Sequence, residues 1–142
     1  MRHKTKVRMK KKSILPAILL MGVLSGCQGN WQTEVEVMGG VTEKYVGEID
    51  KNSPVVHGTE WLLRNAGNAR LRIDSIKPSC DCLELHFDSS MTAGTGDYFP
   101  IRGLLHPEEG DTGVIYREVE VYGNFPSSPL VLSLKGEVVS GE

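Results

Sequence analysis

Short segments in which apolar and polar side chains alternate fill the chain from residue 41 onward. An alternation with a period of two is the pattern of a β-strand that buries one face. Asn, Gly and Pro, the usual turn-forming residues, separate these segments, and no segment has the period of an amphipathic helix. The sequence therefore predicts an all-β domain. The expected strands are 44–50, 54–64, 71–77, 83–87, 97–105, 114–122 and 130–139.

The number and spacing of these strands indicate one architecture. About seven short strands, spaced roughly eight to twelve residues apart, are typical of an immunoglobulin-like antiparallel β-sandwich. A small β-barrel is the alternative. Pro100 predicts that the strand 97–105 lies at a sheet edge or ends near it, because proline cannot donate a ladder hydrogen bond. Residues 33–37 could add one more strand, and residues 89–96 are expected to form a loop.

The first 27 residues have the layout of an export signal. Seven basic residues and no acidic residue precede the apolar run 14–24, which is too short for a bilayer core that needs about 20 residues. The small residues Ser25 and Gly26 then lead into Cys27, as in the lipobox of a bacterial lipoprotein signal peptide. A secretory signal with an incidental cysteine and an uncleaved anchor are the alternatives. We expect residues 1–26 to be the signal peptide, 27–40 a lipidated tether and 41–142 the folded domain.

A lipid on Cys27 would place the protein in the cell envelope. Acyl chains would hold it on a membrane, since each buried methylene contributes roughly 0.8 kcal/mol. Residues 28–30 lack the acidic run expected of a surface-export signal, so we expect the periplasmic face of the outer membrane. Of the 16 basic and 18 acidic residues, seven basic ones lie in residues 1–26, which leaves 9 basic against 18 acidic. This acidity argues against nucleic acid or anionic lipid as the partner. The expected partners are the membrane, through the lipid on Cys27, and another envelope protein.

Three segments in a fixed order carry a family resemblance. Trp61–Asn68 is an aromatic strand that ends in Asn-Ala-Gly-Asn, Leu71–Ile73 is a short Leu-Arg-Ile strand, and Ser79–Cys82 reads Ser-Cys-Asp-Cys. In this order they resemble the bacterial family called domain of unknown function 1573, and the resemblance extends over residues 45–138. Later parts of the family pattern correspond to Gly113, Val119–Asn124 and Leu134–Val138.

The resemblance implies an immunoglobulin-like domain, and many members of this family are lipoproteins. The chain departs from the family pattern in the cysteine motif. Asp81 stands where the family has a glycine between the cysteines, and Leu83 stands where it has a threonine. Any role that depends on the usual Cys-Gly-Cys-Thr sequence therefore does not carry over directly.

Cys80 and Cys82 are the candidate thiol pair, because Cys27 is assigned to the lipid. Residues i and i+2 of a strand point to the same face. The two cysteines could be buried small residues or a strained disulfide. They could be a redox dithiol, although the neighbouring Asp81 would raise a thiol pKa. They could also bind Cu(I) or Zn²⁺ with His86 as a weak third candidate.

No sequence pattern indicates catalysis. The serines lie outside the usual nucleophile motifs, and we expect neither an enzyme nor a cofactor beyond the covalent lipid on Cys27. The sequence therefore predicts a lipid-anchored envelope protein with one immunoglobulin-like interaction domain. The alternative is an envelope protein that handles thiols or a soft metal through Cys80 and Cys82.

Overall fold

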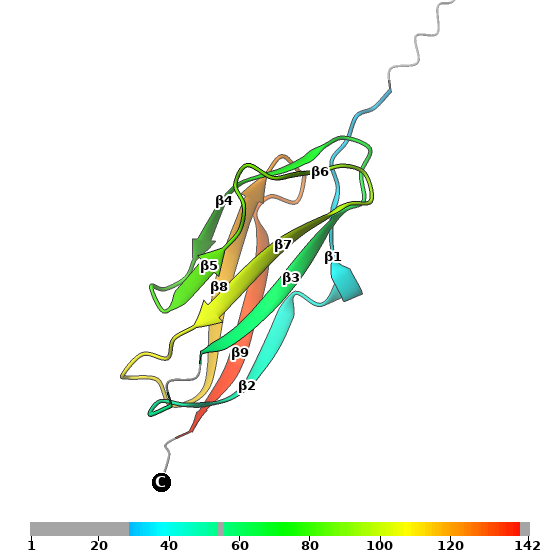
Figure 1. Ribbon diagram of the computed structural model, residues 1–142. Coiled ribbons are helices and arrows are strands. Elements are labelled where there is room, and N and C mark those ends of the chain that lie inside the picture. The colour runs from blue at the N-terminus through cyan, green and yellow to red at the C-terminus, as the bar shows by residue number, and fades with distance from the viewer. Residues whose placement is uncertain (1–28, 54–55, 140–142) are drawn as a thin grey trace, which may run out of the picture.

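The computed structural model describes residues 29–53 and 56–139. They form two β-sheets packed face to face (Figure 1). The predicted signal peptide and Cys27 lie outside the described residues. A 3-10 helix, η1, spans Met38–Gly40. The strands are β1 (Val35–Val37), β2 (Glu43–Asp50), β3 (His57–Asn65), β4 (Leu71–Pro78), β5 (Leu83–His86), β6 (Thr92–Ala93), β7 (Tyr98–Leu105), β8 (Gly113–Gly123) and β9 (Leu130–Val139).

The sandwich has more strands than the sequence predicted. Nine strands lie in the described residues, where we expected about seven. The additional ones are both short. β1 belongs to the predicted tether, but it pairs with β3 in register from Val35 opposite Asn65. β6 lies inside the predicted loop 89–96 and pairs with β4 through two residues only.

The sheets differ in their strand order. One sheet has the order β1-β3-β7-β5 and the other β2-β9-β8-β4-β6. The pairs are antiparallel, as expected, with one exception among the described strands: β2 runs parallel to β9. The first long strand therefore pairs with the last one, and most of the domain lies between them in sequence.

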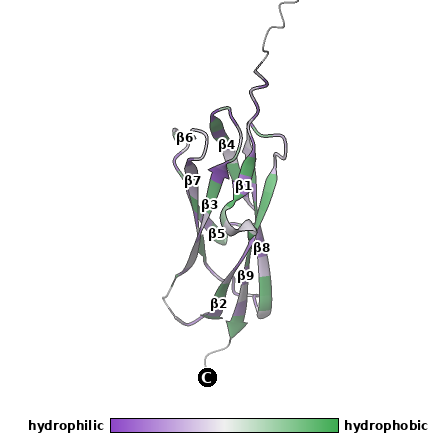
Figure 2. Cartoon of the chain, turned by 90° about the vertical axis from the view of Figure 1, so that its right-hand side faces the viewer, coloured by the Kyte–Doolittle hydropathy of each residue, from purple (hydrophilic) through white to green (hydrophobic). Residues whose placement is uncertain are grey.

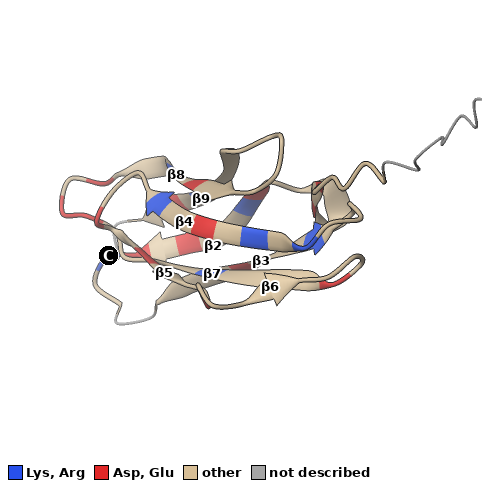
Figure 3. Cartoon of the chain, turned by 90° about the horizontal axis from the view of Figure 1, so that it is seen from above, with Lys and Arg blue, Asp and Glu red and all other residues tan. Residues whose placement is uncertain are grey.

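The core fills the space between the two sheets. Trp61, Phe99 and Leu134 are completely buried there, and the indole N–H of Trp61 donates a hydrogen bond to the carbonyl oxygen of Thr42 at 3.2 Å. Apolar and polar segments alternate along the strands (Figure 2). Basic and acidic residues alternate along β4 in the view from above (Figure 3). The alternation of apolar and polar residues that predicted the fold thus corresponds to an alternation between positions that face the core and positions that face solvent.

A β-bulge in β2 changes which side chains face the core. The register with β9 shifts between Tyr45 and Glu48, and Gly47 in this interval has a φ of 92°. Such a φ is readily adopted only by glycine, and one extra residue reverses the inward and outward sequence of a strand. Tyr45 is therefore exposed while Ile49, four residues later, is fully buried.

Pro100 predicted a strand at a sheet edge, which is wrong for β7 as a whole but holds at the position of Pro100 itself. β7 lies between β3 and β5, so it is not an edge strand. The ladder with β5, however, covers only Arg102 to Leu105. Pro100 therefore pairs with β3 alone, opposite Leu62, and it lies where β7 has one free side.

Candidate functional site

The turn between β4 and β5 carries the two cysteines. Cys80 and Cys82 form a disulfide, with 5.1 Å between their Cα atoms. Cys82 is 5% exposed, whereas Cys80 is half-buried. The backbone N–H of His106 donates to the carbonyl oxygen of Cys82 at 2.8 Å. This contact attaches the turn to the end of β7, so the position of the disulfide is fixed by the four-stranded sheet.

A charged side chain from the other sheet reaches this disulfide. In β8, Ile115 and Val119 are buried and face the core, and Arg117 lies between them on the same face. The Nε–H of Arg117 donates to Sγ of Cys82 at 3.0 Å. Only 15% of the Arg117 side chain is exposed. A guanidinium group that is mostly buried needs partners that compensate for its lost hydration.

Asp111 is the main partner of this arginine. Its Oδ1 lies 2.5 Å from Nη2 of Arg117, and its side chain is 12% exposed. Glu108 contributes a longer contact of 3.5 Å. Burial acts to raise the pKa of Asp111, but a hydrogen bond from the backbone N–H of Glu108 and the charge and hydrogen bond of Arg117 together hold this pKa below its usual value. The Cys82 sulfur thus lies beside a fixed positive charge.

The predicted metal ligands do not come together as a site. Nε2 of His86 lies 2.9 Å from one carboxylate oxygen of Glu84, and Nε2 of His106 lies 3.4 Å from the other. All three side chains are about half exposed. Within residues 29–53 and 56–139, no group of three or more His, Cys, Asp or Glu side chains is arranged to hold a metal ion. The sulfur atoms of Cys80 and Cys82 are bonded to each other.

Sequence reasoning missed Arg117 and Asp111. A signal for Arg117 was present, because it takes an inward position in the alternation of the strand 114–122. A charged residue at such a position requires a buried partner or a function. Asp111 carried no comparable signal, since it belongs to a turn with two other carboxylates, Glu108 and Glu109.

A second feature is a row of side chains across the outer face of the five-stranded sheet. Tyr45 on β2 is opposite Lys135 on β9, which is opposite Tyr116 on β8. The two tyrosines are 61% and 52% exposed. Nζ of Lys135 lies 5.3 Å from the centre of the Tyr116 ring, within the range of a cation–π interaction. Val114, also exposed, precedes Tyr116 by two residues on the same face.

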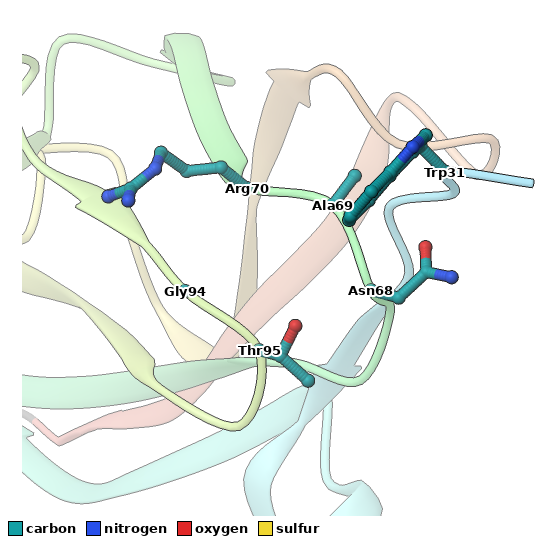
Figure 4. Close-up of a pocket in the computed structure, with 6 residues that line it drawn as sticks. All are labelled: Trp31, Asn68, Ala69, Arg70, Gly94 and Thr95. Carbon is teal, nitrogen blue, oxygen red and sulfur yellow. The ribbon is translucent and has the colours of Figure 1, made fainter. Parts of the chain in front are cut away.

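A third feature is a surface hollow at the end of the sandwich where the chain enters (Figure 4). Its volume is about 390 Å³. Trp31 forms one wall beside Ala69 and is 77% exposed. Arg70 extends to the other side and donates a hydrogen bond to Oγ1 of Thr92 at 3.2 Å.

In the described residues, no helix has the length and apolar character needed to cross a membrane.

Comparisons with known proteins add a family and a set of similar folds. A search of curated proteins finds no match. A protein of unknown function from Porphyromonas gingivalis W83 is similar, with a TM-score of 0.63 and 19% sequence identity. The match covers 81% of this chain and 51% of that one, so the chain spans about half the length of the Porphyromonas protein. An identity this low shows a shared fold alone.

Two further structures are similar at lower identity. The PapD-like domain 7 of human CEP192 has a TM-score of 0.54 at 10% identity, with 100% of both chains covered. The VesB protease of Vibrio cholerae has a TM-score of 0.52 at 9% identity, over 77% of this chain and 32% of that one. These likenesses and the two sheets confirm the predicted immunoglobulin-like sandwich. The family described as "Protein of unknown function (DUF1573)" matches residues 40–138, and the chain therefore belongs to this family, as the resemblance in its sequence indicated.

Proposed function

We propose that this protein is a lipid-anchored module of the cell envelope whose sandwich binds another envelope protein through the outer face of its five-stranded sheet. The observation that carries the proposal is the exposed row Tyr45, Lys135 and Tyr116. Tyrosine is enriched at the energetic centres of protein interfaces. A rigid sheet presents such side chains with little loss of conformational entropy on binding.

The anchor is supported by the lipobox-like sequence that ends at Cys27. It is further supported by Trp31, which follows four residues later and is exposed beside the hollow where the chain enters the sandwich. Tryptophan is enriched at the level of lipid headgroups. An anchored domain would thus rest with this end toward the bilayer, which leaves the Tyr45–Lys135–Tyr116 row accessible from the side. We propose the periplasmic face of the outer membrane as the location.

A photocrosslinking experiment in the producing cell tests the interaction. A photoreactive phenylalanine analogue is placed at position 45 or 116, and at position 98 as the control. Tyr98 is also an exposed tyrosine, but it lies on β7 of the other sheet. We expect one discrete protein adduct from positions 45 and 116, and none from 98. The same adduct from all three positions, or none from any, would contradict the proposed surface.

The anchor needs its own test. Intact mass of the protein from the membrane fraction should show removal of residues 1–26 and added acyl chains on Cys27. Cys27→Ser should release the protein into the soluble fraction. A full-length chain with an unmodified Cys27 would refute the anchor without affecting the interaction surface.

A second function, thiol–disulfide exchange, is favoured by the contact between Arg117 and Cys82. A positive charge beside a sulfur favours its thiolate form, and the thiolate is the species that exchanges. The burial of Cys82 restricts access to this sulfur, but the half-buried Cys80 is open to an incoming thiol. The disulfide leaves both sulfurs without the thiolate form that a soft metal requires, so exchange is favoured over metal binding.

This function is tested by incubating the oxidised full-length protein, in detergent, with graded ratios of reduced and oxidised dithiothreitol. Acid quenching and alkylation then give the fraction of open disulfide by mass. Reversible opening of Cys80–Cys82 in a protein that keeps its native circular dichroism spectrum would support exchange. A disulfide that opens only when denaturant is added would exclude it.

A further inference from the structure

We infer that the Cys80–Cys82 disulfide opens with a fixed polarity: an external thiolate attacks Sγ of Cys80, and Cys82 leaves as a thiolate that Arg117 stabilises. This inference rests on the exchange function proposed above and assigns a separate role to each sulfur. It also gives a function to an arginine that faces the core of the sandwich.

The first argument is the unequal exposure of the two sulfur-bearing residues. Cys82 is 5% exposed and belongs to the hydrophobic core, whereas Cys80 is only half-buried and packs against that core. Thiol–disulfide exchange requires the attacking sulfur to approach one of the two disulfide sulfurs directly. Of the two residues, Cys80 is the more open to such an approach from solvent. Cys82 is therefore placed as the leaving group.

The second argument is the unequal charge around the sulfurs. The Nε–H of Arg117 points at Sγ of Cys82, 3.0 Å away. A hydrogen bond to a charged group is stronger than one to a neutral group, so this contact strengthens as negative charge develops on the departing sulfur. A leaving thiol with a lower pKa departs faster. The structure thus favours departure of the sulfur that is the less exposed of the two.

The third argument is that the arginine is held in place. Asp111 contacts Nη2 at 2.5 Å, and the Nη1 group donates to the carbonyl oxygen of Tyr116 at 3.0 Å. These contacts use the distal nitrogens and leave Nε for the sulfur. Donors fixed before the reaction stabilise developing charge without the cost of reorganisation.

The chemical step balances with a thiol as the named co-reactant. The attacking thiolate forms a bond to Sγ of Cys80, the Cys80–Cys82 bond breaks, and its electron pair stays on Cys82. A second thiolate then attacks the sulfur of the bound thiol and releases Cys80 as a thiolate. Two thiols are oxidised to one disulfide, the protein disulfide is reduced to two cysteines, and the two protons lost by the thiols end on these cysteines.

Single-cysteine variants test the polarity in the reverse direction. When an external disulfide oxidises the reduced protein, the same path requires capping of Cys80 before Cys82 closes the bond. Full-length Cys82→Ser and Cys80→Ser proteins in detergent are mixed with hydroxyethyl disulfide, and the mixed disulfide is followed by mass. We expect Cys82→Ser to react at least about tenfold faster. Equal rates, or a faster Cys80→Ser protein, would overturn the polarity.

Two charge variants test the role of Arg117. Arg117→Gln should slow opening by 2-mercaptoethanol about tenfold, because one charge-assisted hydrogen bond to the leaving sulfur is lost. Asp111→Asn should slow opening less than Arg117→Gln does, because Arg117 keeps its charge but loses a contact that holds it in place. A general loosening of the fold would accelerate opening in both variants, and this result would overturn the assignment. Arg117→Lys should recover part of the lost rate by returning the charge.

A spectroscopic measurement separates this inference from the function on which it rests. In Cys80→Ser, the thiolate of Cys82 absorbs near 240 nm, and the Cys80→Ser/Cys82→Ser protein gives the baseline. Adding Arg117→Gln should raise the pKa of Cys82. An unchanged pKa would refute the role of Arg117 even if exchange occurs, whereas a native disulfide inert to all thiols would refute the exchange function itself.

Discussion

Nε of Arg117 lies 3.0 Å from Sγ of Cys82, although Arg117 belongs to the five-stranded sheet and Cys82 leads into the four-stranded one. The contact therefore joins the two layers of the sandwich. A hydrophobic pair at this position would also close the gap between the sheets. Instead, the positive charge beside the disulfide belongs to Arg117, which is paired with Asp111. The first prediction concerns this pair.

Asp111→Asn should destabilise the protein near neutral pH by about 1.5–3 kcal/mol, because a hydrogen-bonded carboxylate is removed from a mostly buried arginine. The pKa of Asp111 is lowered in the folded state. Its stabilising contribution is therefore present above the pKa of the unfolded chain and is lost as the pH falls through the lowered folded-state pKa. Melting temperatures of the native and variant proteins should differ most near pH 7 and converge in acid. Glu109→Gln, in the same turn, is the control, and a pH-independent difference would contradict the prediction.

Loss of the disulfide should have a small effect on stability. The Cys80–Cys82 bond closes a loop with a sequence separation of 2, and the chain-entropy model gives about 1.6 kcal/mol for so short a loop. We expect Cys80→Ser/Cys82→Ser to fold and to unfold in urea with a slightly lower midpoint. A double variant that fails to fold would show that the disulfide is a structural requirement, and the exchange function would lose its main support.

Asn65 should be intolerant of the isosteric change to aspartate. Its side chain is completely buried, and its amide nitrogen donates to the carbonyl oxygens of Ala69 at 2.7 Å and Ala93 at 3.0 Å. Aspartate would place a carboxylate oxygen against both carbonyls, so Asn65→Asp should cost about 3 kcal/mol or more. Chemical denaturation measures the loss. Asn52→Asp, at an exposed turn, should change stability by less than about 0.5 kcal/mol.

The bulge in β2 should require glycine. Gly47 has a φ of 92°, and no heavy atom lies within 4 Å of a Cβ built there. Gly47→Ala should therefore lose about 1–2 kcal/mol through backbone strain alone. Gly110→Ala, which has equal space and no positive φ, should be nearly neutral in the same thermal melt. Similar losses in both variants would show that the bulge does not depend on the conformation of Gly47.

The sequence predicted most of the fold because each long strand buries one face. The alternation of the buried Trp61 and Leu63 with less buried neighbours, for example, is the burial pattern of β3. The short strand β6 was not readable in this way, because two residues are too few for a period. The three residues of β1 lie within 33–37, which the sequence offered as one more possible strand. Parallel pairing of β2 with β9 was missed as well, since alternation does not specify a partner.

The candidate site was predicted only in part. Cys80 and Cys82 stand out by residue type and spacing, but the arginine beside them is 35 positions away from Cys82 in sequence. Its approach depends on the packing of β8 against the β4–β5 turn, which no local pattern contains. The Tyr45–Lys135–Tyr116 row was not visible in the sequence for a related reason. Tyr45 and Ile49 are four residues apart and would face the same side of a regular strand. The bulge at Gly47 places them on opposite faces, so that Tyr45 points outward.

The pairing of β2 with β9 also has a consequence for biogenesis. Ile49 and Val138 come together only when the two ends of the domain meet, because Ile49 is opposite Val138 in the parallel ladder. Contacts between such distant segments form slowly, and a chain that emerges from a secretion channel N-terminus first cannot make them until its last strand has passed through. For the exported protein that we propose, the sheet that carries the tyrosine row would therefore be completed at the very end of export, after the N-terminal segment has become available to any enzyme that processes it.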